Sequence, residues 1–134
     1  FGCTLCGQVC PTGAIRKLPL EDKQQVRLGH AAIDRGRCLP FAHATPCIVC
    51  EETCPTPKKA IWLERVTVRD REGRPVRLQQ PHVDLTACIG CGACEKHCPV
   101  VGQPAIYVTS AGESRSEEHQ LLLQVPTGTP LPYR

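Results

Sequence analysis

The stretch Cys88-Ile-Gly-Cys91-Gly-Ala-Cys94-Glu-Lys-His-Cys98-Pro99 decides how this chain folds. Its spacing, C-x2-C-x2-C-x3-C-P, is that of a bacterial-type [4Fe–4S] site. The two residues between successive cysteines let the chain wrap around one corner of a cluster. The proline fixes its own φ and donates no backbone hydrogen bond, so it turns the chain away. The stretch therefore predicts an iron–sulfur centre at residues 88–99.

The first cysteine motif, Cys3-Thr-Leu-Cys6-Gly-Gln-Val-Cys10-Pro11, holds only the second half of the same pattern. A complete motif would have a further cysteine a few residues before Phe1. The chain has 11 cysteines, and one more would make three sets of four. We therefore expect a fragment that binds about three [4Fe–4S] clusters, one of which lacks a ligand.

The middle motif, residues 38–55, departs from the pattern in another way. Cys47, Cys50 and Cys54-Pro55 are regularly spaced, but an insert, residues 39–46, separates them from Cys38. Cys38 could be a free buried thiol, and a histidine of the insert, His43, could replace a ligand. Three complete sets of cysteines nevertheless favour Cys38 as a ligand. The candidate cluster ligands are all the cysteines of the chain: Cys3, Cys6, Cys10, Cys38, Cys47, Cys50, Cys54, Cys88, Cys91, Cys94 and Cys98.

Each Cys-Pro pair is followed by a short turn and then by the same dipeptide, Ala14-Ile15, Ala60-Ile61 or Ala105-Ile106. Short apolar stretches at 31–34 and 82–85 precede the second and third motifs and indicate strands. The repeated unit is thus a strand, a cysteine loop, one helical turn and a strand. This repeat predicts the α+β fold class of bacterial-type ferredoxin-like modules, with tandem [4Fe–4S] cluster loops and few regular elements.

In such a module the fourth cysteine of one motif ligates the cluster of the other motif. Cys10, Cys54 and Cys98 should therefore each serve a different cluster from their sequence neighbours. Two pairings are open. The first and second motifs could pair, with residues 14–18 and 28–34 as the central hairpin, or the second and third motifs could pair. We favour the first option, because the connection between its two motifs is the shorter one.

The cysteine motifs place the tandem 4Fe-4S ferredoxin-type region at residues 1–108. Within it, alternating residues at about 65–80 surround a charged turn with Gly73, which predicts an exposed β-hairpin. The hairpin could be a docking surface for a redox partner, but a solvated hairpin without such a role is the simpler interpretation. Residues 109–134 lose the pattern and predict a partly disordered tail, in which Leu121–Leu123 could pack on the module or on a partner.

Composition argues against several classes of function. The formal net charge is +3, but Lys and Arg are scattered without a basic stripe, which argues against a nucleic-acid partner. We find no nucleophile–base grouping, paired carboxylates or phosphate-binding loop, so we expect an electron carrier rather than an enzyme, with no small-molecule substrate. A zinc-binding interaction module is the alternative. Zinc sites usually combine two C-x2-C pairs, which these cysteine triplets match poorly.

The middle motif with its displaced Cys38, together with Lys59-Ala-Ile-Trp-Leu-Glu64, resembles the ferredoxin-type proteins of the NapG/MauM group. The stretches 88–98 and 3–11 resemble other motifs of that group, so the similarity covers about residues 1–108. The resemblance implies a polyferredoxin with several [4Fe–4S] clusters. It implies electron transfer between redox partner proteins, a membrane quinol-side subunit and a terminal oxidoreductase. It also implies a periplasmic, membrane-associated location, although any export signal would precede Phe1.

Overall fold

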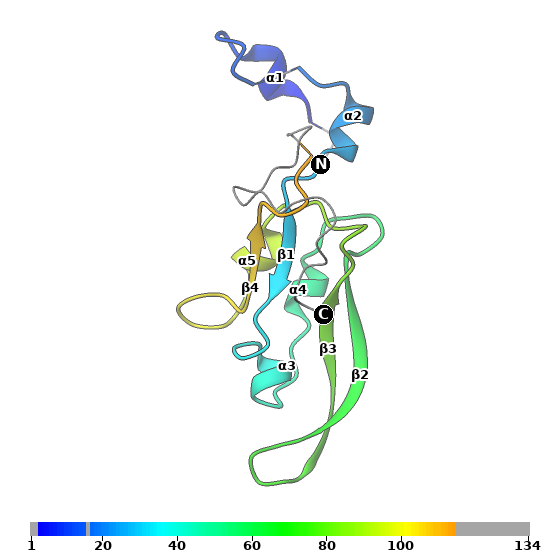
Figure 1. Cartoon of the computed structure of the whole chain (residues 1–134), viewed down its shortest axis with the longest axis vertical. Helices are drawn as coiled ribbons and strands as arrows, with labels where there is room; N and C mark the ends of the chain where they lie inside the picture. Colours follow the sequence, from blue (N-terminus) through cyan, green and yellow to red (C-terminus); the bar gives the residue numbers. More distant parts are fainter. Residues whose placement is uncertain (1–2, 16, 115–134) are drawn as a thin grey trace, which may run out of the picture.

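The computed structural model describes residues 3–15 and 17–114, so most of the predicted tail lies outside the described residues. This part of the chain forms the following helices and strands, in order: α1 (Leu5–Val9), α2 (Leu20–Gln25), β1 (His30–Ile33), α3 (Leu39–Ala42), α4 (Val49–Glu52), β2 (Ile61–Arg69), β3 (Pro75–Val83), α5 (Ala93–Lys96) and β4 (Ile106–Thr109). The molecule is elongated, with α1 and α2 at one end and the turn between β2 and β3 at the other (Figure 1). The predicted mixture of short strands and short helical turns is confirmed.

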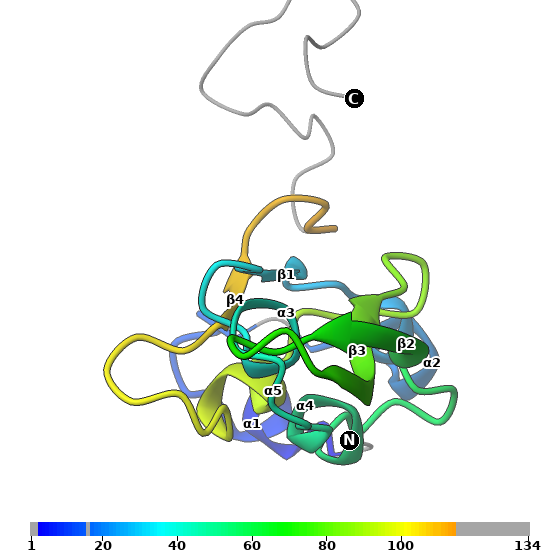
Figure 2. The same cartoon turned by 90° about the horizontal axis from the view of Figure 1, so that it is seen from below.

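The strands form two antiparallel pairs, β1 with β4 and β2 with β3. Ile33 lies opposite Ile106 in the first pair, and Ile61 lies opposite Val83 in the second. The strand before the second motif, β1, therefore pairs with the strand after the third motif, β4. The strand after the second motif, β2, pairs with the strand before the third motif, β3. Seen along the long axis, α4 and α5 lie on the same side of the two strand pairs (Figure 2).

This topology joins the second and third motifs, so the favoured pairing of the first motif with the second is wrong. No strand occurs before β1 in the described part of the chain, and the hairpin expected from residues 14–18 and 28–34 does not form. The reason lies in the connection between the second and third motifs. It is a β-hairpin, closed by a turn in which the Asp70 N–H donates to the Arg74 carbonyl (3.0 Å). A hairpin brings its own ends together, so its length does not count against the pairing.

The two strand–loop junctions of the module have the same local structure. The Asp34 N–H donates to the Ala105 carbonyl (2.8 Å), and the Asp84 N–H donates to the Ala60 carbonyl (2.7 Å). Each aspartate also accepts a backbone N–H two residues further on through Oδ1 (2.9 Å in both). Such side-chain-to-backbone bonds turn the chain, so each strand ends at its aspartate and leads into a cysteine loop.

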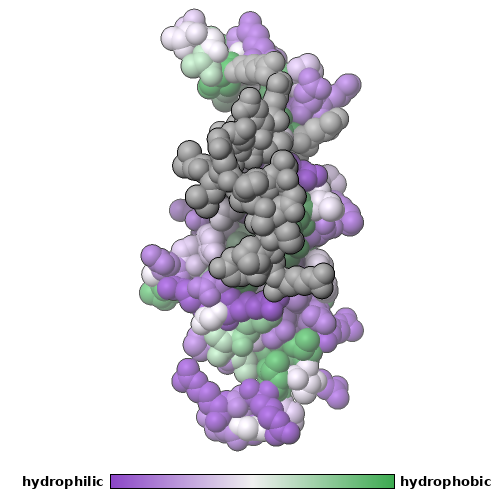
Figure 3. Space-filling model, in the orientation of Figure 1, coloured by the Kyte–Doolittle hydropathy of each residue, from purple (hydrophilic) through white to green (hydrophobic). Residues whose placement is uncertain are grey.

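The interior of the module consists of alanine, isoleucine and cysteine side chains. Its buried cluster comprises Ala31, Ala60, Ile61, Cys88, Cys94 and Ile106. The β2–β3 hairpin projects away from this interior. Its residues include the segment at about 65–80 in which the sequence predicts a hairpin. Its far end is mostly hydrophilic in the space-filling view (Figure 3). Cysteine side chains are therefore part of the buried cluster, together with apolar side chains of β1, β2 and β4.

Candidate metal centre

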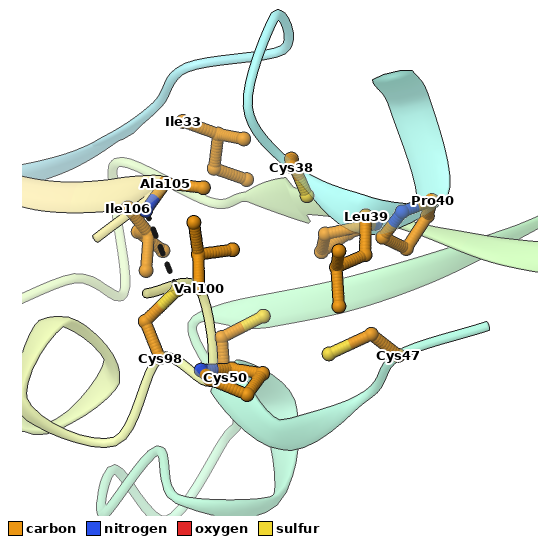
Figure 4. A pocket seen from close by; sticks show the side chains of 12 residues that line it. Ile33, Cys38, Leu39, Pro40, Cys47, Cys50, Cys98, Val100, Ala105 and Ile106 are labelled. Atoms are coloured by element: carbon orange, nitrogen blue, oxygen red, sulfur yellow. Dashed lines mark hydrogen bonds between the residues drawn. The ribbon is translucent and has the colours of Figure 1, made fainter. Parts of the chain in front are cut away.

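Four cysteines from two motifs line one cavity of the module, which we call hollow 1. Cys38, Cys47 and Cys50 come from the second motif, and Cys98 comes from the third. The rest of the lining of hollow 1 is aliphatic side chains and prolines. The sulfur atoms of Cys38, Cys47 and Cys50 point into a common space, with Cys98 at its edge (Figure 4).

A second cavity, hollow 2, has the reciprocal set of cysteines. Cys88, Cys91 and Cys94 come from the third motif, and Cys54 comes from the second. Each hollow thus receives three cysteines of one motif and the last cysteine of the other.

Backbone geometry lets the cysteine loop at hollow 2 fit against the rest of the module. Gly90 has a φ of +68°, a region that favours glycine. A Cβ atom added at Gly90 would lie 2.6 Å from the backbone N and O of Gly29. Gly90 is therefore required both by its conformation and by the close approach of a neighbouring segment.

Hydrogen bonds to sulfur show that the hollows suit thiolate ligands. The Ala31 N–H donates to Cys88 Sγ (3.4 Å), and the Ala105 N–H donates to Cys98 Sγ (3.3 Å). Donors around the sulfur atoms stabilise metal-bound thiolates and tune the metal. All 11 cysteines are free thiols, so no disulfide competes with such a role.

Burial sets the protonation of these thiols. It raises the pKa of Cys38 to about 11, that of Cys94 to about 11 and that of Cys50 to about 12, and the charges of neighbouring cysteines act in the same direction. For Cys54, burial also acts to raise the pKa, but hydrogen bonds from the side chain and backbone of Thr56 and from the backbone of Ala60 and Ile61 together outweigh it, and the net shift of the pKa is downward. Metal binding by the buried thiols would therefore release protons.

The first motif is arranged differently. Cys3 and Cys6 are exposed, and neither hollow is lined by a cysteine of this motif. Cys10 Sγ lies 3.5 Å from the Ile15 N–H and 3.6 Å from the Thr12 hydroxyl. These two donors, with Ile15 the larger influence, lower the pKa of Cys10 to about 7. The structure thus brings together eight of the predicted site residues and leaves these three apart.

The arrangement bears on the zinc alternative. In the described part of the chain, no group of three or more His, Cys, Asp or Glu side chains is placed to hold a single metal ion. A zinc ion needs sulfur atoms at about 2.3 Å from one centre, whereas a cluster of four irons offers one corner to each thiolate. The wider gathering of four thiols around each hollow fits a cluster better than an ion. His43, the possible substitute ligand, is exposed and does not line hollow 1.

Three residues that the cysteine spacing did not single out also support the site. Thr56 is buried, and its Oγ1 lies 3.2 Å from Cys54 Sγ. Lys59 Nζ donates to the carbonyls of Glu51, Glu52 and Cys54 at 3.0, 2.9 and 3.0 Å, where α4 ends. Glu95 Oε2 accepts the Val108 N–H (2.8 Å) and so ties α5 to β4. The threonine that follows Cys-Pro in both of the first two motifs could have suggested Thr56.

Comparison with known proteins agrees with this geometry. The family model of the 4Fe-4S binding domain matches residues 79–100, from β3 into the third motif. The methylamine utilization ferredoxin-type protein MauM of Methylorubrum extorquens is 40% identical over 115 residues, which is 81% of this chain and 47% of that protein. The chain is similar to the NapG/MauM group of ferredoxin-type proteins. The predicted resemblance is confirmed, and [4Fe–4S] clusters are the cofactor.

Two further relatives extend the comparison. The ferredoxin-type protein NapG of Escherichia coli is 39% identical over 113 residues, which is 84% of this chain and 47% of that protein. Ferredoxin Fdx8 of Sorangium cellulosum is 33% identical over 72 residues, 46% of this chain and 66% of that protein. The chain spans about half the length of the NapG and MauM relatives. No solved structure matches it. Among the described residues, no helix has the length and apolar character needed to cross a membrane.

Proposed function

We propose that the chain transfers electrons through [4Fe–4S] clusters held in hollow 1 and hollow 2. The observation that carries this proposal is the reciprocal set of cysteines, three from one motif and the last from the other in each hollow. This is the crossed arrangement of two-cluster bacterial-type ferredoxins. Cys3, Cys6 and Cys10 are the proposed ligands of a further cluster.

The residues of the chain have clear tasks in such a carrier. When bound, a [4Fe–4S] cluster accepts and releases one electron at a time. The thiolates would hold the irons, and the aliphatic lining would keep water away from the sulfur atoms. The backbone N–H groups of Ala31 and Ala105 would donate to cysteine sulfur in hollow 2 and hollow 1. No described residue needs a catalytic role in this scheme.

The whole protein would act as a ferredoxin-type subunit that feeds or drains a partner oxidoreductase. The similarity to NapG and MauM supports this role, because both are named as ferredoxin-type proteins. We propose a membrane quinol-side subunit and a terminal oxidoreductase as the redox partners, at a periplasmic, membrane-associated location.

Anaerobic reconstitution tests the proposal. The chain should take up iron and sulfide and show the broad visible absorption of iron–sulfur clusters, whereas a zinc-binding module would stay colourless and take up zinc in preference. Preference for zinc, with no stable iron–sulfur absorption, would overturn the proposal.

Single Cys→Ser variants then test the crossed ligation. Cys54→Ser and Cys88→Ser should disturb one and the same cluster in the EPR spectrum of the reduced protein. Cys50→Ser and Cys98→Ser should disturb the other. If each motif instead filled its own site, Cys50→Ser and Cys54→Ser would alter the same signal, and the proposed sets of ligands would be wrong.

A further inference from the structure

Hollow 1 and hollow 2 are lined by equivalent residues of the two halves of the module. In the order hollow 1 then hollow 2, the equivalent cysteines are Cys38 and Cys88, Cys47 and Cys91, Cys50 and Cys94, and Cys98 and Cys54. The prolines after the last cysteines and the alanine–isoleucine pairs that follow are equivalent too. Against this symmetry, two positions differ in the hydrogen bond that they can give to a cysteine sulfur.

The first difference lies on the strands that lead into the motifs. Ala31 of β1 lines hollow 2, and its N–H donates to Cys88 Sγ at 3.4 Å. The equivalent residue of β3 is Pro81, which is fully buried and lines hollow 1. Proline has no N–H, so Cys38, the counterpart of Cys88, receives no hydrogen bond from this position.

The second difference follows the last cysteine of each motif. Thr56 lines hollow 2, and its Oγ1 lies 3.1 Å from the Ala60 N–H and 3.2 Å from Cys54 Sγ. Because Oγ1 accepts from Ala60 and a thiolate cannot donate, the hydroxyl proton points to the sulfur. The equivalent of Thr56 in hollow 1 is Val100, which has no hydroxyl. There the Ala105 N–H donates to Cys98 Sγ directly (3.3 Å).

The first difference gives hollow 2 one more donor to sulfur than hollow 1, because Cys88 receives the Ala31 N–H and Cys38 has only Pro81 at the equivalent place. The second difference exchanges one donor for another, since the Thr56 hydroxyl serves Cys54 and the Ala105 N–H serves Cys98. Reduction adds negative charge to a cluster and its thiolates, and hydrogen bonds to the sulfur atoms stabilise that charge. From these donors we infer that the cluster in hollow 2 has a higher reduction potential than the cluster in hollow 1. This inference rests on the proposed function, because it needs a cluster in each hollow. The exposure of Cys91 to water acts in the same direction, and the Glu95 carboxylate beside β4 acts against it.

Unequal potentials give the module a direction. With a cluster bound in each hollow, an electron that enters at hollow 1 would be favoured to pass on to hollow 2, and the oxidation at hollow 1 would balance the one-electron reduction at hollow 2. The electron then rests mainly in hollow 2. Thr56 and Pro81 are positioning and tuning residues in this scheme, since they act through the ligands Cys54 and Cys38 rather than on the irons.

The chain itself suggests the two variants that test the inference. Thr56→Val gives hollow 2 the residue type of hollow 1, and Pro81→Ala gives hollow 1 the residue type of hollow 2. Redox titration of the reconstituted chain, followed by EPR, should show Thr56→Val lowering the higher midpoint potential. Pro81→Ala should raise the lower one. Roughly a tenfold change in the one-electron equilibrium constant, or about 59 mV, is expected for each.

Controls separate tuning from structural damage. Thr56→Ser keeps the hydroxyl and should keep the wild-type potential, while Thr67→Val makes the same change on the exposed surface of β2 and should shift neither midpoint. Iron and sulfide content is measured for every variant. If clusters are present and Pro81→Ala moves the higher midpoint, or moves none, the inference is wrong while the proposed function stands. If neither hollow binds a cluster in the wild-type chain, the proposed function fails first.

Discussion

The first motif and the paired second and third motifs share a sequence signal but differ in burial. Cys3 and Cys6 are exposed, whereas Cys38, Cys88 and Cys94 are buried. The isoleucine that follows each Cys-Pro shows the same contrast, because Ile15 is 51% exposed and Ile61 only 3%. A cysteine motif therefore specifies candidate ligands by itself, but the enclosure of those ligands comes from a second motif that packs against it.

The largest expected effect comes from comparing the loss of a cysteine in the paired motifs with the loss of a cysteine in the first motif. Cys98→Ser should destabilise the reconstituted protein by about 4 kcal/mol or more, because it removes a ligand from an enclosed site. Cys6→Ser removes a ligand of the proposed further cluster, but Cys6 is exposed and lines neither hollow, so the folded module should lose only about 0.5 kcal/mol or less. Anaerobic thermal denaturation followed by circular dichroism measures both. Equal losses would mean that the first motif is as much a part of the folded core as the third.

The repeated isoleucine offers the next test. Ile61→Ala removes a side chain of the buried cluster that also lines hollow 2, and it should cost about 3 kcal/mol. Ile15→Ala removes an exposed one and should cost less than about 0.5 kcal/mol. Chemical denaturation of the reconstituted variants gives both values. A large effect of Ile15→Ala would show that residues near the first motif are buried by a contact beyond those described.

The ability to predict this site from the sequence follows the same division. The spacing of the cysteines alone indicated the cofactor, the candidate ligands and the short helical turns, because C-x2-C loops that end in Cys-Pro are typical of [4Fe–4S] sites. The pairing of motifs was missed, because residues 61–83 fold back on themselves and make a long connection short in space. The strand expected at 82–85 ends at Val83, since Asp84 turns the chain into the cysteine loop.

Pro81 and Thr56 could not be recognised as partners of Cys38 and Cys54 by spacing. Their significance depends on which strand lies beside which cysteine, and this becomes visible only when Ala31 and Pro81 occupy equivalent places. From the sequence alone, a proline argues against a central strand and predicts only an edge strand or a bulge. In the folded module, the missing N–H of Pro81 leaves Cys38 in hollow 1 without the hydrogen bond that Cys88 receives in hollow 2.

Two glycines test the contrast at the level of the backbone. Gly90→Ala, in the third motif, combines a φ of +68° with backbone atoms of Gly29 at 2.6 Å from the new Cβ, and should cost about 3 kcal/mol. Gly13→Ala, beside the first motif, has a similar φ of +70° but nothing within 4 Å, so it should cost about 1 kcal/mol. The difference between the two melting temperatures isolates the close approach. Identical values would show that Gly29 moves away at no cost.

The smallest effect concerns two lysines that donate to cysteine carbonyls. Lys59 Nζ donates to the Cys54 carbonyl and to two carbonyls at the end of α4, so Lys59→Met should cost about 1 kcal/mol. Lys23 Nζ donates to the carbonyl of the exposed Cys3, and Lys23→Met should cost less, because water can replace this single bond. Lys59→Met should also speed the loss of the hollow 2 cluster to a chelator, since Cys54 lines that hollow. If Lys23→Met proved the more damaging, the carbonyl of Cys3 would have to be as well shielded from water as that of Cys54, and the contrast between the two regions would disappear.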